Sequence, residues 1–174
     1  MVNKNTIQGL GQKEAELVAR LSYEKKKIVR AEELDRFLPE NFKYRKQFVY
    51  NLKQKGILTP IKRGVYAFTP LDSIPSGIRV NELLIPPIFF PRENYYVGYS
   101  TMFNYYGFIE QLFQVVYVIN TSLCQERNIS GITYKFVKVS EDRLYGLERI
   151  KIEGAEVMIS SKERTLVDLI YFNK

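Results

Sequence analysis

Side chains that can bind phosphate and hydrogen-bond to bases gather between residues 43 and 63. This stretch holds seven Lys or Arg residues and no Asp or Glu. At 100° per residue, a helix over 41–56 would present three lysines, two amides and one phenol on one face: Lys43, Lys46, Gln47, Tyr50, Lys53 and Gln54. Cations bind phosphates, whereas lysines and amides can read base edges in the major groove of DNA. Because a solvated helix usually mixes both signs of charge, this face indicates a polyanion partner.

A second group of basic residues follows in "KRGVYAF", residues 62–68. Together with "ILTPI", this alternating stretch predicts two short strands around a turn at Lys62, Arg63 and Gly64. Gly64 permits a tight turn and a close approach to phosphate, and Pro60 suits an edge strand. Lys62 and Arg63 would lie over the DNA backbone or minor groove while the helix enters the major groove. Arg45 would reach phosphate from the edge of the helix.

Three short helices are predicted before this hairpin, over 11–21, 31–38 and 41–56. Pro39 ends the second helix, Asn41 caps the third and Gly56 ends it. The inner face of the third helix would carry Tyr44, Phe48, Val49 and Leu52. Three helices followed by a basic hairpin predict that residues 1–69 form a winged helix-turn-helix DNA-binding domain.

The remaining residues predict a linker and a second domain. Residues 70–94 hold five of the seven prolines, which is typical of a linker. Residues 95–174 predict an α+β domain on a mostly antiparallel sheet. Its expected elements are strands at 95–100, 114–120 and within 131–140, a helix capped by Ser100 and ended by Gly107, a hairpin over 148–160 turning at Glu153-Gly154, and a closing helix after residue 160. The fold class is therefore α+β.

Polar residues of the second domain have structural explanations. Ser160 and Glu163 have the spacing of a capping box, and Arg164 and Asp168 have that of an i,i+4 ion pair. A metal-dependent nuclease would need clustered carboxylates, and no spacing motif joins Asp142, Glu153 and Glu156. There is no His, and Cys124 is the single Cys, which removes the commonest general base and Cys-rich zinc sites. We expect no catalytic residue, no metal and no cofactor.

The charge is concentrated in the first part of the chain. Residues 1–69 hold 15 Lys or Arg against 7 Asp or Glu, a net charge of +8. Residues 70–174 hold 11 against 12, a net charge of −1. The most apolar stretch, "LLIPPIFF", is too short to span a bilayer, and the N-terminus has no secretory signal. We expect a cytoplasmic protein whose first domain binds the polyanion.

Four segments dispersed over nearly the whole chain resemble a known family: "LGQKEAELVARL", "VYNLKQKGILTPIKRGVYAF", "YYVGYSTMFNYYGFIEQ" and "ISSKERTLVDLIY". They are similar to the antitoxin and autorepressor of AbiE-type (type IV) abortive-infection toxin–antitoxin systems. The resemblance implies repression of the protein's own promoter through inverted repeats in double-stranded DNA. It also implies that the second domain counters a nucleotidyltransferase-like toxin without a stable complex. Family members continue with further helices after "ERTLVDLIY", and we expect the 95–174 domain to lack them.

Two other functions remain open on the sequence. The first is a protein-interaction adaptor that acts through the C-terminal domain. The second is a nucleic-acid-processing enzyme that uses Asp142 or Glu153. Inverted repeats could be bound by a dimer or by two monomers that bind cooperatively, and the sequence does not distinguish these arrangements.

Overall fold

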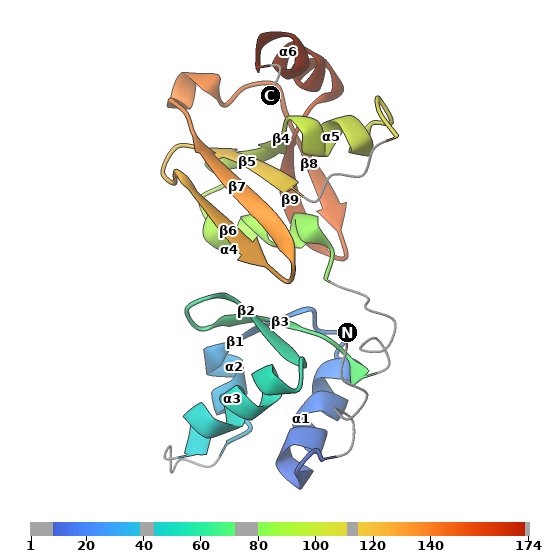
Figure 1. Cartoon of the computed structure of the whole chain (residues 1–174), viewed down its shortest axis with the longest axis vertical. Coiled ribbons are helices and arrows are strands. Elements are labelled where there is room, and N and C mark those ends of the chain that lie inside the picture. Colours follow the sequence, from blue (N-terminus) through green and yellow to red (C-terminus); the bar gives the residue numbers. More distant parts are fainter. Residues whose placement is uncertain (1–8, 39–43, 72–79, 111–114, 173–174) are drawn as a thin grey trace. The chain divides into compact units, whose positions relative to one another are not determined.

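The computed structural model describes residues 9–38, 44–71, 80–110 and 115–172 (Figure 1). The chain divides into two compact units, Met1–Val80 and Asn81–Lys174. We call them the N-terminal unit and the C-terminal unit, and each is described by itself. The fold class is α+β in both units, as the sequence predicts.

The N-terminal unit combines three helices with a three-stranded antiparallel sheet. Its elements in chain order are α1 (Gln12–Tyr23), β1 (Ile28–Arg30), α2 (Ala31–Asp35), α3 (Arg45–Gln54), β2 (Leu58–Lys62) and β3 (Val65–Phe68). Strand β3 is central, with β1 on one side and β2 on the other. The predicted helices and hairpin are therefore present, Pro60 lies on an edge strand as expected, and β1 is an additional strand. The second helix is shorter than predicted: it ends at Asp35 and not at 38, so Pro39 does not end it.

One apolar core holds the N-terminal unit together. It takes side chains from all three helices and from the sheet: Leu17, Val18, Leu21, Val29, Leu34, Leu52, Ile57, Leu58 and Phe68. Each of these residues is at most 3% exposed. Burial of such a set supplies the main favourable term in folding, so the core fixes α3 against α1, α2 and the sheet.

The third helix starts later than predicted and ends where predicted. It begins at Arg45 rather than 41, and the proposed cap Asn41 lies outside the described residues, as does Pro39. Tyr44 precedes the helix and is 76% exposed, so its predicted place on the inner face is wrong. Gly56 follows the last turn with φ 71, which a glycine adopts without strain, and this end is confirmed.

The C-terminal unit is built on a six-stranded sheet. Its elements are the short 3₁₀ helices η3 (Glu82–Leu84) and η4 (Glu141–Arg143), the helices α4 (Pro86–Phe89), α5 (Ser100–Tyr105) and α6 (Lys162–Phe172), and the strands β4 (Tyr95–Gly98), β5 (Val115–Asn120), β6 (Gln125–Ile129), β7 (Ile132–Lys138), β8 (Leu147–Ile152) and β9 (Ala155–Ser160). The strand order is β6-β7-β5-β4-β9-β8 (Figure 1). Three pairings are antiparallel, whereas β4–β9 and β5–β7 are parallel, so the sheet is mixed.

The second half of the segment predicted as a linker is folded into the C-terminal unit. Leu83, Leu84, Ile85 and Phe90 are buried there. The Tyr134 hydroxyl donates to the Glu82 carbonyl at 3.0 Å, which ties η3 to β7. Prolines here start the short helix α4, a position that tolerates the missing amide hydrogen. Residues 72–79 of the predicted linker lie outside the described residues.

Two predicted helix caps are displaced by one residue. Helix α5 begins with Ser100 itself, and the residue at its cap is Tyr99, which adopts φ 53 and makes no side-chain capping bond. At α6 the Ser161 hydroxyl accepts the Arg164 amide hydrogen at 3.1 Å, so Ser161 and not Ser160 caps the helix. The predicted capping box is therefore wrong, whereas the predicted turn at Glu153-Gly154 is confirmed.

Candidate nucleic-acid interface

The outer face of α3 carries exposed polar side chains, as the sequence predicts. The exposed residues are Lys46, Gln47, Tyr50, Lys53 and Gln54. On the opposite side, Leu52 is fully buried and Phe48 and Val49 pack against the core. Lys43, the remaining member of the predicted set, lies outside the described residues. The helix thus separates its apolar and polar sides sharply, and within the described turns the polar side holds no carboxylate.

Gln47 on this face is oriented by a hydrogen bond within the helix. Its Nε2 donates to Asn51 Oδ1 at 2.8 Å, one turn further along the helix. This bond leaves the Gln47 carbonyl oxygen as an acceptor and its second amide hydrogen as a donor. An oriented amide of this kind is suited to the paired donor and acceptor of an adenine edge.

Arg45 is predicted to contact phosphate, but its side chain already has partners within the N-terminal unit. Its Nη1 forms an ion pair with Asp35, and its Nη2 donates to the Ala31 carbonyl at 3.2 Å. Both contacts join the first turn of α3 to α2, and the Arg45 side chain is only 20% exposed. A phosphate contact by Arg45 would require it to share or leave Asp35, so the structure gives it a positioning role.

Lys55 holds the other end of α3. Its Nζ pairs with the Glu14 carboxylate on α1 and also donates to the Gly9 carbonyl at 2.7 Å. Glu14 is 6% exposed, so this ion pair is largely removed from water. Two of the seven cations in the acid-free stretch therefore fix the helix in place, and the remaining described ones lie on its outer face or at the hairpin.

Three cations lie at the turn of the hairpin, and one of them, Arg30, is not predicted by the sequence pattern. Arg30 and Lys62 both pair with Val65 in the sheet, from opposite sides, and Arg63 follows in the turn. Partial burial and, second, the nearby charge of Arg30 lower the pKa of Lys62. Arg30 was missed because β1 was not predicted, although "KKKIVR" ends in a strand-like apolar pair followed by a cation.

The turn is tied directly to α2. Gly64 adopts φ 75, and its carbonyl accepts the Ala31 amide hydrogen at 2.8 Å. Ala31 is the first residue of α2, and α2 is in turn held to α3 by Arg45. The basic turn and the polar face of α3 are therefore parts of one connected framework.

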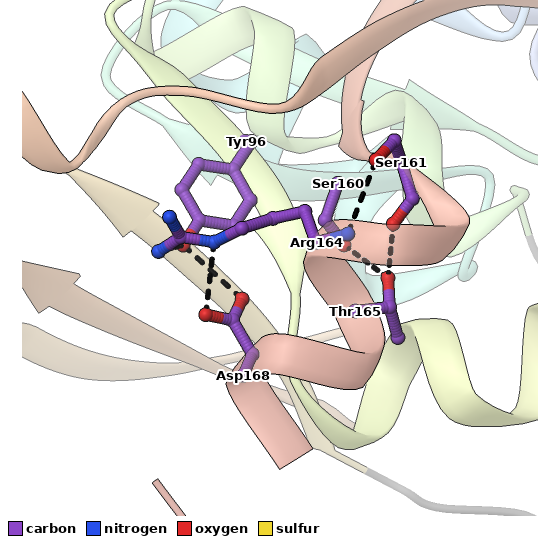
Figure 2. A network of polar contacts seen from close by, with 6 residues as sticks. All are labelled: Tyr96, Ser160, Ser161, Arg164, Thr165 and Asp168. Atoms are coloured by element: carbon purple, nitrogen blue, oxygen red, sulfur yellow. Dashed lines mark hydrogen bonds and ion pairs between the residues drawn. The ribbon is translucent and has the colours of Figure 1, made fainter. Parts of the chain in front are cut away.

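A second polar cluster lies in the C-terminal unit, around α6 (Figure 2). Arg164 Nε contacts Asp168 Oδ1 at 2.9 Å, which confirms the predicted ion pair, and the two side chains are 4% and 0% exposed. Tyr96 joins them from β4: it accepts from Arg164 Nη2 at 3.1 Å and donates to Asp168 Oδ2 at 3.3 Å. Burial raises the pKa of Asp168 even though Arg164 opposes it. Tyr96 was missed, since one buried tyrosine among 13 gives no signal in the sequence.

The structure does not bring the proposed carboxylates together. Asp142 lies in η4 and Glu153 in the β8–β9 turn, while Glu156 in β9 pairs with Arg149 at 3.2 Å. No group of three or more His, Cys, Asp or Glu among the described residues is placed to hold a metal ion. In the same ranges, no helix has both the length and the apolar character needed to cross a membrane.

Comparison with known proteins shows a likeness to a solved structure. No protein-family model matches the chain. No curated protein matches it either. The crystal structure of the RV2827C protein from Mycobacterium tuberculosis is similar, with a TM-score of 0.57 and 13% sequence identity. The likeness covers 82% of this chain and 51% of that chain, so this chain spans about half the length of its structural neighbour. At this identity the likeness shows a shared fold.

Proposed function

We propose that the N-terminal unit is a winged helix-turn-helix that binds double-stranded DNA in a sequence-specific way. The observation that carries the proposal is the acid-free outer face of α3 next to a basic hairpin turn. In this arrangement α3 enters the major groove, with Lys46 and Lys53 on phosphates or guanines and Gln47 on an adenine edge. Tyr50 contacts the groove wall, and Arg30, Lys62 and Arg63 lie on the backbone or in the minor groove.

The order of elements supports this proposal. A winged helix has a short strand between its first two helices and a hairpin after the third, and the three strands form one small sheet. The chain has this order, with β1 between α1 and α2 and with β3 central in the sheet. In such a domain the third helix and the hairpin turn face the same duplex, and in this chain both carry exposed cations, Lys46 and Lys53 on α3 and Arg63 in the turn.

The biological role we propose is that of an antitoxin-type transcriptional autorepressor in the cytoplasm. The support comes from the resemblance of four sequence segments to AbiE-type antitoxins, and the C-terminal unit would then counter a nucleotidyltransferase-like toxin without a stable complex. A reading frame of that type next to the gene for this chain is the expected observation.

The decisive experiment compares two duplexes of equal length. One carries the region upstream of the protein's own gene, and the other carries the same bases in scrambled order. Fluorescence anisotropy at several salt concentrations should show tighter binding to the upstream duplex and a steep fall of log affinity with log salt. Equal and weak binding to both duplexes would contradict sequence-specific recognition.

One observation favours a protein-interaction adaptor as the second candidate. Leu166, Leu169 and Ile170, which share one face of α6, are between 40% and 77% exposed. Large apolar side chains grouped on a helix face are typical of a protein interface. Co-purification of the product of the neighbouring reading frame, abolished by Ile170→Glu and retained by Lys162→Glu on the same helix, would support this function over DNA binding alone.

A further inference from the structure

The C-terminal unit contains a cavity of about 520 Å³ between the η4 segment and α6. It is lined by Asp142, Arg143, Tyr145, Arg164, Val167 and Tyr171. Its volume lies within the range of small-molecule sites, which is about 300–1,000 Å³. Neither the DNA-binding face nor the exposed apolar face of α6 explains why two arginines and two tyrosines line one cavity.

Arg164 is the most unusual lining residue, because it is buried and incompletely paired. The residue is only 5% exposed. Its Nη2 and Nε are engaged by Tyr96 and Asp168, but Nη1 makes no hydrogen bond to any described residue. A buried N–H group without an acceptor costs about 1–3 kcal/mol, and more when it is charged, so Arg164 is held in the wall of the cavity at a real cost in free energy.

The wall beside Arg164 is preformed. Arg164 Cζ lies 4.0 Å from the centre of the Tyr145 ring, and Tyr145 is itself 55% exposed. The next residue, Gly146, has φ 64, and its carbonyl accepts the Ser161 amide hydrogen at 2.8 Å. A Cβ at Gly146 would lie 3.0 Å from Arg164 Cβ, so the loop and α6 approach each other closely. Tyr145 is thus held over the guanidinium before any ligand arrives.

The chemistry of the lining selects the class of ligand. Planar guanidinium groups such as those of Arg143 and Arg164 match the oxygens of a phosphate group. Asp142 would repel a free anion but accepts hydrogen bonds from hydroxyl groups. Tyr145 and Tyr171 offer aromatic surface to a planar ring. We propose that this cavity binds a phosphorylated small molecule with hydroxyls and a planar ring, a nucleoside monophosphate being the class that combines all three features.

The test is calorimetric titration of the full chain with AMP, adenosine and inorganic phosphate. AMP should bind at one site per chain and about tenfold more tightly than either adenosine or phosphate, which corresponds to about 1.4 kcal/mol. The absence of saturable AMP binding would overturn the proposal. Adenosine that binds as tightly as AMP would also overturn it, because the guanidinium groups would then contribute nothing.

Variants of the cavity rim locate the site. Arg164 belongs to the buried network, so the test uses Arg143→Ala and Tyr145→Leu, which should each weaken AMP binding about tenfold. The control Arg92→Ala removes an exposed arginine outside the cavity and should leave the affinity within about twofold. The triple variant K46A/K53A/R63A should also bind AMP normally, because it changes only the proposed DNA face. AMP binding that survives both rim substitutions, or that the triple variant abolishes, would place the nucleotide elsewhere.

Discussion

The ammonium group of Lys53 lies 5.9 Å from the centre of the Tyr66 ring. Lys53 is on the outer face of α3, and Tyr66 is in β3, where it packs against the core of the N-terminal unit. Attraction between a cation and an aromatic face contributes about 0.5–1 kcal/mol at exposed sites. The contact therefore helps to fix the polar face of the helix relative to the hairpin, so that the two form one surface.

Removal of three cations from this surface should weaken binding to the upstream duplex at every salt concentration. K46A/K53A/R63A should lower the slope of log affinity against log salt by about 3, because each lost phosphate contact removes about 0.9 released counterions. Anisotropy titrations at four salt concentrations measure this slope. The matched control K13A/R92A/K151A removes the same charge from exposed positions outside the surface and should leave the slope nearly unchanged. An equal effect of both variants would mean that only net charge matters.

Gln47→Ala should reduce the preference for the upstream duplex over the scrambled duplex without reducing the affinity for DNA in general. A paired amide contact to the correct base contributes about 1–3 kcal/mol of discrimination. The ratio of affinities for the upstream and scrambled duplexes should therefore fall at least fivefold, while binding to the scrambled duplex stays constant. Gln12→Ala, which removes an exposed amide on α1, is the control. A preserved ratio in the Gln47 variant would exclude this residue from base recognition.

DNA affinity should depend on pH through Lys62. Partial burial and the charge of Arg30 lower its pKa, so the lysine loses its proton below the ordinary value of about 10.4. Affinity should fall as the pH rises through this window, and Lys62→Arg, which stays charged, should retain it. Stability of the free protein should change in the opposite sense: the unfolded chain binds this proton more tightly, so the free energy of unfolding rises with pH there. Lys46→Arg is the control and should leave the pH profile of binding unchanged.

Arg45 and Lys46 are neighbours whose substitutions should have different effects. Arg45→Met removes the contacts that join α3 to Asp35 and Ala31, and should lower the free energy of unfolding by about 1 kcal/mol. Lys46→Met changes an exposed side chain and should lower DNA affinity without loss of stability. Urea unfolding and anisotropy on both variants separate the two roles. An unchanged free energy of unfolding for Arg45→Met would contradict the positioning role and favour a phosphate contact by Arg45.

Asp168→Ala should be among the most destabilising substitutions in the C-terminal unit. It leaves Arg164 charged and uncompensated in the interior, a change that costs about 3–5 kcal/mol. The double variant R164M/D168L should recover much of this loss, because both buried charges are replaced by apolar side chains. The exposed Asp142→Ala serves as the control in thermal and urea unfolding. A loss below about 1 kcal/mol for Asp168→Ala would show that water reaches the pair.

Local patterns were sufficient to predict most helices and strands. The periodicity of Leu17, Val18 and Leu21 identified α1, and Gly56 and Gly154 marked a helix end and a turn that the structure confirms. The strand β1 was missed because it has only three residues and exists through pairing with β3, more than thirty residues further along the chain. The strand β6 was missed because "QERNI" has no apolar alternation.

Partners of the polar residues were harder to predict than their positions. The outer face of α3 follows from helical spacing alone. The ion pair between Arg45 and Asp35 depends on how α2 and α3 pack. The hydrogen bond between Tyr96 and Arg164 depends on β4 lying close to α6. The i,i+4 pair of Arg164 and Asp168 was predictable because both residues lie on one helix. The spacing of residues along the sequence does not predict contacts between elements that are distant in the sequence.

Pro60 lies on β2, at one edge of the three-stranded sheet of the N-terminal unit. A proline has no amide hydrogen to donate, so a strand from another chain cannot add to this edge with a complete ladder. The edge is thereby protected from pairing between copies, which is a common route to aggregation. Two copies on the half-sites of an inverted repeat would accordingly meet through side-chain contacts, or communicate through the bend of the duplex, and not through a shared sheet at β2.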